Sequence, residues 1–354
     1  MQGSCPRSSR CLALLLVLGA ACYTSRDDFD PAADSNGTAG SIGAADSIEP
    51  ADSGQGTTPD PTADPSTTAD PSTTANLDSA ADSSTTLPPE DDSTSGAVDE
   101  PMGPVPDLPT PRAPCPVITE GMVTFTVDGV NREVRVWMEP AASAAMDGPL
   151  VFYWYGTNGQ PSQAQGALGN GLSLITDLGG LVIAPVHING GPFPWLEQSE
   201  ADHRLVDEVV ACADQAPGID ARQIHGLGFS AGGLFTSELS LVRPSYLASV
   251  ATYSGGGSGD LGGSRTVPSA MILHGGPSDE VNGFNFLDSS ADYQQTLEEA
   301  GGLTIMCNHG SGHTIPGGVG PAIVQFWLDH PFGIEASPYA GGLPPALPGY
   351  CTAP

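Results

Sequence analysis

In this 354-residue chain the residues best suited to chemistry surround Ser230, in the segment 228–232 that reads GFSAG. The apolar run 224–229 is typical of a buried strand, and residues 231–242 have a helical pattern. A turn that joins strand to helix without a loop brings the two backbones into near contact, so only small residues fit two positions before and after the serine. This G-x-S-x-G pattern holds a serine exposed above a sheet as a nucleophile. The alternative interpretation is a tight turn with a purely structural role.

A serine nucleophile needs a general base, and the base needs an acid that orients it. On such a turn the chain order is serine, then acid, then histidine. Asp279 follows the apolar run 269–276 after Pro277 and Ser278 and is the predicted acid. Asp260, in a glycine-rich loop, is the alternative. Asp288 and Asp292 lie in the next helical pattern and are expected on its solvated face.

Four histidines follow Ser230. Three of them, His274, His309 and His313, are candidates for the base, and His313 is the predicted one. It lies beyond the last apolar run, in GSGHTIP, where a loop position gives the reach that a general base needs. His274 stands at a strand end before the acid and is expected to be a structural hydrogen-bonding residue, and His309 is still at a strand end. Cys307, His309 and His313 could together bind zinc, but the glycines between them preset no geometry and Cys307 is expected in a disulfide. We therefore predict no metal site.

An oxyanion formed at an attacked carbonyl needs prearranged N–H donors. The first predicted donor is the N–H of Ala231, and the second is the N–H of Thr157, which follows the apolar run 148–156. In the later segment GGPFPWLEQ, Phe193 and Trp195 could form the walls of an aromatic or apolar acyl pocket. The alternative is that Trp195 only packs its loop onto the body of the domain.

The hydrophobic pattern indicates the elements that must position these residues. Alternation on both sides of Asp128-Gly129 predicts a hairpin over 121–140. Continuous apolar runs, typical of buried parallel strands, lie at 148–156, 179–186, 223–229, 247–255, 269–276 and 303–310. Helical patterns lie at 163–178, 199–215, 231–242, 286–300 and 319–329. This alternation predicts an α/β fold with a mostly parallel sheet, helices on both faces and ligands at the carboxyl ends of the strands.

Three motifs, GLGFSAGG, HGGPSDEV and CNHGSGHTIP, occur in an order and at separations that resemble a known family. This family is the secreted polyhydroxybutyrate depolymerase and feruloyl/acetylxylan esterase group of α/β hydrolases. The resemblance covers nearly all of the globular part of the chain. It implies an α/β-hydrolase fold, ester hydrolysis through an acyl-enzyme without a cofactor, and Ser230, Asp279 and His313 as nucleophile, acid and base. Tyr155 and Ile315 stand where the family usually has His and Trp.

The charge balance limits the possible partners. All ten basic residues are Arg, and the chain carries 41 Asp and Glu, for a net charge of −31. From residue 113 onward there are 23 acidic residues and six Arg, a net charge of −17. Such a field repels nucleic acids and anionic membrane surfaces. The lack of Lys also excludes a Walker loop, a Schiff-base lysine and a Ser–Lys dyad.

The N-terminal composition predicts an export signal and a linker. Residues 1–22 contain two arginines and then an apolar run too short to span a bilayer. Small residues lead to Cys22, as at a bacterial lipoprotein cleavage site, which predicts a lipidated N-terminus that tethers the protein to a membrane; simple secretion is the alternative. Residues 23–112 are rich in Asp, Ser, Thr and Pro and predict a disordered acidic linker. Residues 113–354 predict one globular domain.

Four cysteines in the globular part predict two disulfides in an exported chain. They are Cys115, Cys212, Cys307 and Cys351, and they allow three pairings. The pair Cys115–Cys351 is favoured, because the two ends of a domain often lie close together.

The most direct functional prediction is a serine ester hydrolase. Only about a dozen residues separate ATYSGG from the next apolar run, which leaves no room for a large helical lid. An open site suits esters on a polymer, such as plant cell-wall polysaccharides or polyesters. The alternatives are a peptidase on the same scaffold and a non-catalytic surface-binding protein. We expect a monomer that binds no nucleic acid.

Overall fold

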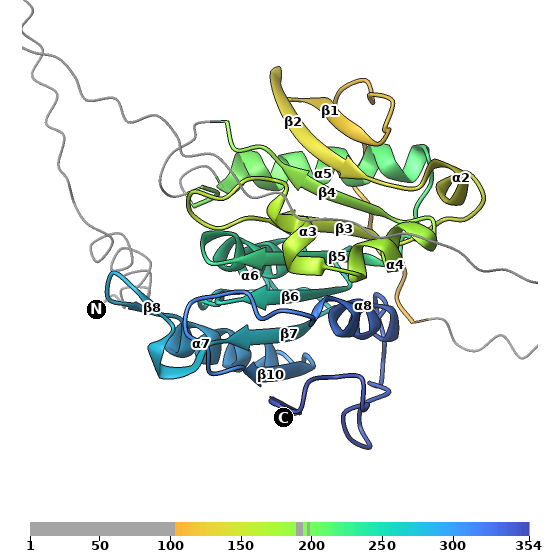
Figure 1. Ribbon diagram of the computed structural model, residues 1–354. Coiled ribbons are helices and arrows are strands. Elements are labelled where there is room, and N and C mark those ends of the chain that lie inside the picture. Colours follow the sequence, from red (N-terminus) through yellow and green to blue (C-terminus); the bar gives the residue numbers. More distant parts are fainter. Residues whose placement is uncertain (1–102, 189–193, 197–198, 354) are drawn as a thin grey trace, which may run out of the picture. The chain divides into compact units, whose positions relative to one another are not determined.

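The computed structural model describes residues 103–188, 194–196 and 199–353 (Figure 1). In this part of the chain a nine-stranded sheet has the order β1-β2-β4-β3-β5-β6-β7-β10-β11. Its strands are β1 Gly121–Val127, β2 Val130–Trp137, β3 Leu150–Trp154, β4 Leu181–Pro185, β5 Ile224–Phe229, β6 Ser249–Tyr253, β7 Ser269–His274, β10 Thr304–Asn308 and β11 Cys351–Thr352. β4, β3, β5, β6, β7 and β10 are parallel. The short strands β8 Glu280–Val281 and β9 Phe284–Asn285 form a separate hairpin.

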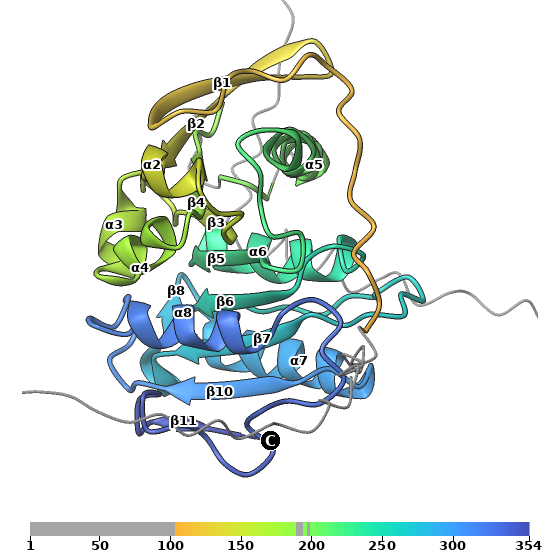
Figure 2. The same ribbon diagram turned by 90° about the vertical axis from the view of Figure 1, so that its right-hand side faces the viewer.

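Helices cover both faces of the sheet (Figure 2). α5, α6 and α7 lie on one face, and α3, α4 and α8 lie on the other. The helices are α2 Pro140–Ser143, α3 Gln163–Leu168, α4 Gly171–Asp177, α5 Ser199–Gln215, α6 Ala231–Val242, α7 Phe286–Glu299 and α8 Gly320–Asp329, with a 3₁₀ turn η1 Gly276–Ser278. Within the described ranges, no helix has the length and apolar character needed to cross a membrane. The predicted α/β architecture is confirmed.

The burial of the strands explains the two hydrophobic patterns. Every side chain of β3, from Leu150 to Trp154, is 0% exposed, because this strand has helices on both faces. Such strands show continuous apolar runs. β1 instead alternates between buried and exposed residues, because only one of its faces packs on α5. The predicted hairpin of β1 and β2 is confirmed, with Val127 paired to Val130 across the turn.

The helix predicted over 163–178 is in fact two helices. α3 ends at Leu168, and α4 begins at Gly171. Between them Gly169 has φ 50° and ψ −128°, a conformation that residues with a side chain rarely adopt. The apolar periodicity continues across this break, so the pattern alone did not reveal it. The break allows α4 to pack against α8.

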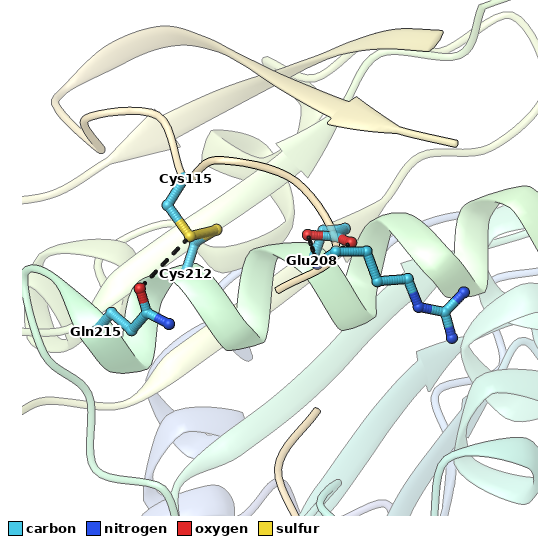
Figure 3. The surroundings of a disulfide bond; sticks show 5 residues. Cys115, Glu208, Cys212 and Gln215 are labelled. Atoms are coloured by element: carbon cyan, nitrogen blue, oxygen red, sulfur yellow. Dashed lines mark hydrogen bonds between the residues drawn. A yellow bond between two sulfur atoms is a disulfide. The ribbon is translucent and has the colours of Figure 1, made fainter. Parts of the chain in front are cut away.

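The segment 103–112 packs on the domain, although its composition placed it in the linker. The N–H of Asp107 donates to Ser245 O at 2.9 Å. The N–H of Arg112 donates to both carboxylate oxygens of the buried Glu208, at 2.9 and 3.1 Å (Figure 3). Backbone hydrogen bonds of this kind leave no signal in composition, which is why the sequence did not reveal the contact.

The two disulfides pair differently from the prediction. Cys115 is bonded to Cys212 on α5 (Figure 3), and Cys307 on β10 is bonded to Cys351 on β11. The favoured pair Cys115–Cys351 is therefore wrong. The two cysteines lie at opposite edges of the sheet, because Cys115 is bonded to α5, which packs on β1, whereas Cys351 is on β11. Cys307 and Cys351 are directly opposite each other in the antiparallel register, with Cα atoms 3.9 Å apart.

We predict that the double substitution Cys115→Ala with Cys212→Ala lowers the free energy of unfolding by about 2–5 kcal/mol. The bond closes a loop with a sequence separation of 97, and a cross-link of that span strongly restricts the unfolded chain. Urea unfolding of the variant and the wild type measures the difference. Reduced wild type is the control, since it loses both bonds; equal midpoints for the oxidised wild type and the variant would contradict the prediction.

Candidate active site

Ser230 lies on a strained turn between β5 and α6. β5 ends at Phe229, α6 begins at Ala231, and Ser230 between them has φ 57° and ψ −120°. The glycines on either side make this turn possible. A Cβ on Gly228 would lie 2.1 Å from the carbonyl oxygen of Gly232, and a Cβ on Gly232 would lie 2.0 Å from that of Trp154. Strain of this kind is found where a residue has a functional task.

The structure brings Ser230, His313 and Asp279 together in one hydrogen-bonded chain. His313 Nε2 lies 2.9 Å from Ser230 Oγ, and His313 Nδ1 lies 2.8 Å from Asp279 Oδ1. The Asp279 side chain is 0% exposed, whereas that of His313 is 18% exposed. A buried carboxylate thus holds one ring nitrogen, so that the other nitrogen faces the serine hydroxyl near the surface.

Two further donors fix the carboxylate of Asp279. Ser254 Oγ and the N–H of Gly275 each donate to Asp279 Oδ2 at 2.8 Å. Burial by itself would raise the pKa of Asp279, but the hydrogen bonds from His313, Gly275 and Ser254 outweigh burial and hold this pKa below its ordinary value. Asp279 is therefore ionised at neutral pH. The sequence marked Ser254 only as a residue at a strand end and did not reveal its contact with the acid.

The loop that carries His313 lies directly on Gly275. The N–H of Gly312 donates to Gly275 O at 3.0 Å, and a Cβ on Gly275 would lie 1.9 Å from Gly312 O. Two phenyl rings contact the imidazole of His313. The centroid of Phe229 is 4.9 Å away and that of Phe286 is 4.5 Å away. Sequence reasoning missed both rings, because it assigned them only to the end of a strand and the start of a helix.

The alternative acids lie elsewhere. Asp260 is exposed, and its Oδ1 accepts from the N–H of Gly262 at 2.9 Å within its own loop. Asp288 lies in the first turn of α7, and Asp288 and Asp292 are both exposed on that helix. None of these contacts is with His313.

The two remaining histidines at strand ends make structural contacts, and Cys307 is in a disulfide. His274 Nδ1 accepts from the N–H of Gly276 at 3.1 Å, and burial lowers the pKa of His274. The N–H of His309 donates to His274 O, and burial also lowers the pKa of His309. Cys307 cannot act as a thiolate ligand, because its sulfur is bonded to Cys351. Among the described residues, no three His, Cys, Asp or Glu side chains are grouped to hold a metal ion.

The predicted oxyanion donors come from two segments beside Ser230. Ala231 is the first residue of α6, and the first N–H groups of a helix have no acceptor within it. The chain at Gly156 passes close to the serine, since a Cβ on Gly156 would lie 3.1 Å from Ser230 Cβ. Thr157 follows and is exposed. The geometry thus places both segments near the hydroxyl.

Trp195 is entirely buried against residues at the end of β3. Its Nε1–H donates to Tyr155 O at 2.8 Å, and its ring makes edge contacts with Trp154 at 4.9 Å and Tyr155 at 4.8 Å between centroids. Of the two alternatives for Trp195, these contacts fit packing, because a side chain with 0% exposure offers no surface to a ligand. Phe193 lies outside the described residues.

A cavity of about 550 Å³ lies next to the oxyanion segment. Most of its lining is polar. The lining residues are Asn158, Gly159, Gln160, Ser162, Gln163, Gly166, Ala167 and Ile315. In the sequence, Asn158 directly follows Thr157, and Ile315 stands two positions after His313.

No protein-family model matches this chain. One curated protein, "Putative esterase NocK" from Nocardia uniformis subsp. tsuyamanensis, is 27% identical over 181 residues. The match covers 44% of this chain and 51% of NocK, so the chain spans about half the length of the curated relative it matches.

Solved structures match over a larger part of the chain. Native pOPH aligns with a TM-score of 0.55 and 18% identity, over 68% of this chain and 96% of pOPH. Native sOPH aligns with a TM-score of 0.53 and 18% identity, over 70% of this chain and 97% of sOPH. At that identity the likeness concerns the fold alone. Together with the sheet order and the serine turn, it gives this domain the α/β-hydrolase fold.

Proposed function

We propose that this protein is a serine hydrolase of carboxylic esters, with Ser230 as nucleophile, His313 as general base and Asp279 as the orienting acid. The observation that carries the proposal is the hydrogen-bonded chain from Ser230 Oγ through the imidazole to a buried carboxylate, at 2.9 and 2.8 Å. Nucleophile, base and orienting group within hydrogen-bond reach are the signature of an activated serine. The curated name of NocK, an esterase, agrees with this proposal.

The reaction follows from the positions of these groups. Ser230 Oγ attacks the ester carbonyl carbon while its proton passes to His313 Nε2, and Asp279 stabilises the resulting imidazolium. The N–H groups of Ala231 and Thr157 donate to the oxyanion of the tetrahedral intermediate. When the intermediate collapses, the alcohol leaves with the proton from His313. Water then attacks the acyl-enzyme in the same way, releasing the acid and restoring Ser230.

The proposed substrates are esters carried by extracellular polymers, namely feruloyl or acetyl esters of plant cell-wall polysaccharides, or polyhydroxyalkanoates. An open site supports this proposal. Between β6 and β7 the described chain contains no helix that could form a lid. Polar side chains such as Asn158 and Gln160 in the neighbouring cavity are suited to a hydroxyl-rich or ester-rich chain.

A parallel assay of purified protein tests the proposal. The substrates are p-nitrophenyl acetate, a feruloyl ester, acetylxylan, a hydroxybutyrate oligomer and a peptide p-nitroanilide. We expect hydrolysis of the simple ester and of at least one polymer-derived ester, without release from the peptide. Cleavage of the peptide alone would assign a peptidase. No hydrolysis of any substrate would favour a binding protein.

We further propose that the protein is exported and attached to a membrane through a lipid on Cys22, which lies outside the described residues. The two disulfides support an oxidising compartment. Substituting Cys22→Ser should release the protein from the membrane fraction into the medium or periplasm, since one Cys carries the anchor. Cys11→Ser is the matched control in the same segment. Identical fractionation of wild type and Cys22→Ser would contradict the anchor.

A further inference from the structure

We propose that Gln163 is a positioning residue that fixes the direction of the Thr157 N–H toward the oxyanion. This inference rests on the proposed ester hydrolysis. Gln163 Oε1 accepts two hydrogen bonds, from the N–H of Gly156 at 3.2 Å and from the hydroxyl of Tyr153 at 2.9 Å. Gln163 is half-buried at the start of α3. One amide oxygen thus joins the end of β3 to the segment beside Ser230.

The bond to Gln163 decides which N–H can serve the oxyanion. Because the N–H of Gly156 donates to Gln163, it is directed away from the reaction. The next peptide group contains the carbonyl of Gly156 and the N–H of Thr157, which point in opposite directions because the peptide is planar. The N–H of Gly159 donates to Gly156 O at 2.9 Å. Both sides of Gly156 are thereby held, and the direction of the Thr157 N–H is set.

The hydroxyl that donates to Gln163 is buried and stays protonated. Tyr153 is 0% exposed, and burial raises its pKa far above the ordinary value, so its hydroxyl remains a neutral donor at every working pH. α3 is itself attached to the sheet, because the hydroxyl of Tyr253 donates to Ala167 O at 2.8 Å. A donor prearranged in this way needs no reorganisation when charge develops on the substrate.

The test compares Gln163→Met, which removes the acceptor at similar size, with Gln165→Met on the exposed part of the same helix. With p-nitrophenyl acetate we expect Gln163→Met to lower kcat by at least about tenfold, with KM within about twofold; the upper bound is the loss of a whole oxyanion donor, about 10²–10³-fold. The inhibition constant of a trifluoromethyl ketone, whose adduct carries an oxyanion, should rise by the same factor. Gln165→Met should change neither.

The variant Gln163→Glu adds a second measurement, the pH dependence of kcat/KM, which a purely structural role of Gln163 would not change. When protonated, its carbonyl oxygen is a neutral acceptor as in Gln; when ionised, it places negative charge beside the oxyanion. The ratio of its kcat/KM to that of wild type should therefore rise as the pH falls from 7 to 4, toward the ordinary Glu pKa of about 4.3. This test also serves if Gln163→Met fails to fold, as judged by circular dichroism.

The outcomes separate this inference from the proposed function. Suppose that the wild type is active. The positioning role alone is then overturned if Gln163→Met equals Gln165→Met in kcat and in the inhibition constant. It is also overturned if the ratio of kcat/KM for Gln163→Glu to that of wild type does not change with pH. A wild type without esterase activity would overturn the proposed function first.

Discussion

Ser230→Ala is expected to abolish hydrolysis of p-nitrophenyl acetate, with kcat lowered about 10⁶-fold. The hydroxyl at this position is the only group that forms the acyl bond in the proposed mechanism, and without it His313 has no proton to accept. The residual rate should be that of the binding site and oxyanion donors acting on water. Stopped assays at high enzyme concentration measure the loss, and acyl-enzyme trapping by mass spectrometry should detect no adduct.

The fold of this variant should persist. Ala and Ser both have a Cβ, so a φ of 57° costs about the same conformational free energy for either residue at position 230. Ser258→Ala, at an exposed position of the β6–β7 connection, is the matched control and should retain full activity. If Ser230→Ala remains active while its unfolding midpoint matches the wild type, the serine mechanism is excluded.

Asp279→Asn is expected to lower kcat about 10⁴-fold while leaving the backbone unchanged. The carboxylate of Asp279 accepts hydrogen bonds at both oxygens, one from His313 and the other from Ser254 and Gly275. An Asn side chain has only one acceptor oxygen, and its NH₂ group is a donor, so it cannot accept on both sides. The imidazole then loses the partner that fixes its tautomer. Steady-state kinetics measure the decrease in kcat. The matched control is Asp260→Asn, which changes the exposed alternative acid and should leave kcat unchanged.

The contribution of Asp279 to the free energy of unfolding depends on pH in a defined direction. The folded-state pKa of Asp279 lies below its ordinary value, so its ionised form contributes stability above the unfolded pKa of about 3.9. That contribution is lost as the pH falls through the lower folded value. The advantage of wild type over Asp279→Asn in urea unfolding should thus shrink as the pH is lowered from 6 to 3. An advantage that grows in acid would contradict the depressed pKa.

The fold was largely predictable, because each central strand is buried on both faces and its apolar run ends where a glycine or polar residue begins. The serine turn was predictable for the same kind of local reason, since Gly228 and Gly232 are required by contacts within a few residues. The motif order then placed Asp279 and His313 at the carboxyl ends of β7 and β10. These features depend on local pattern and chain order, which a sequence contains.

Contacts between distant elements were not predictable. The donation of Ser254 to Asp279 links the ends of β6 and β7, and the acceptor role of Gln163 depends on a helix folding back over its own strand. A Ser or Gln has many possible partners, so its residue type does not select one. The disulfide pairing failed for a related reason: neighbours across β10 and β11 are set by sheet order, which no cysteine spacing encodes.

The bond between Cys115 and Cys212 also determines how the domain would respond to mechanical force. A pull on the N-terminal segment reaches Cys115 before it reaches β1, and the covalent bond carries it into α5. Tension on the N-terminal segment therefore cannot separate the hairpin of β1 and β2 from the sheet unless the disulfide is first cleaved. If the protein acts on a polymer while it is attached to a membrane at its N-terminus, as proposed, this bond would keep the edge hairpin in place under tension.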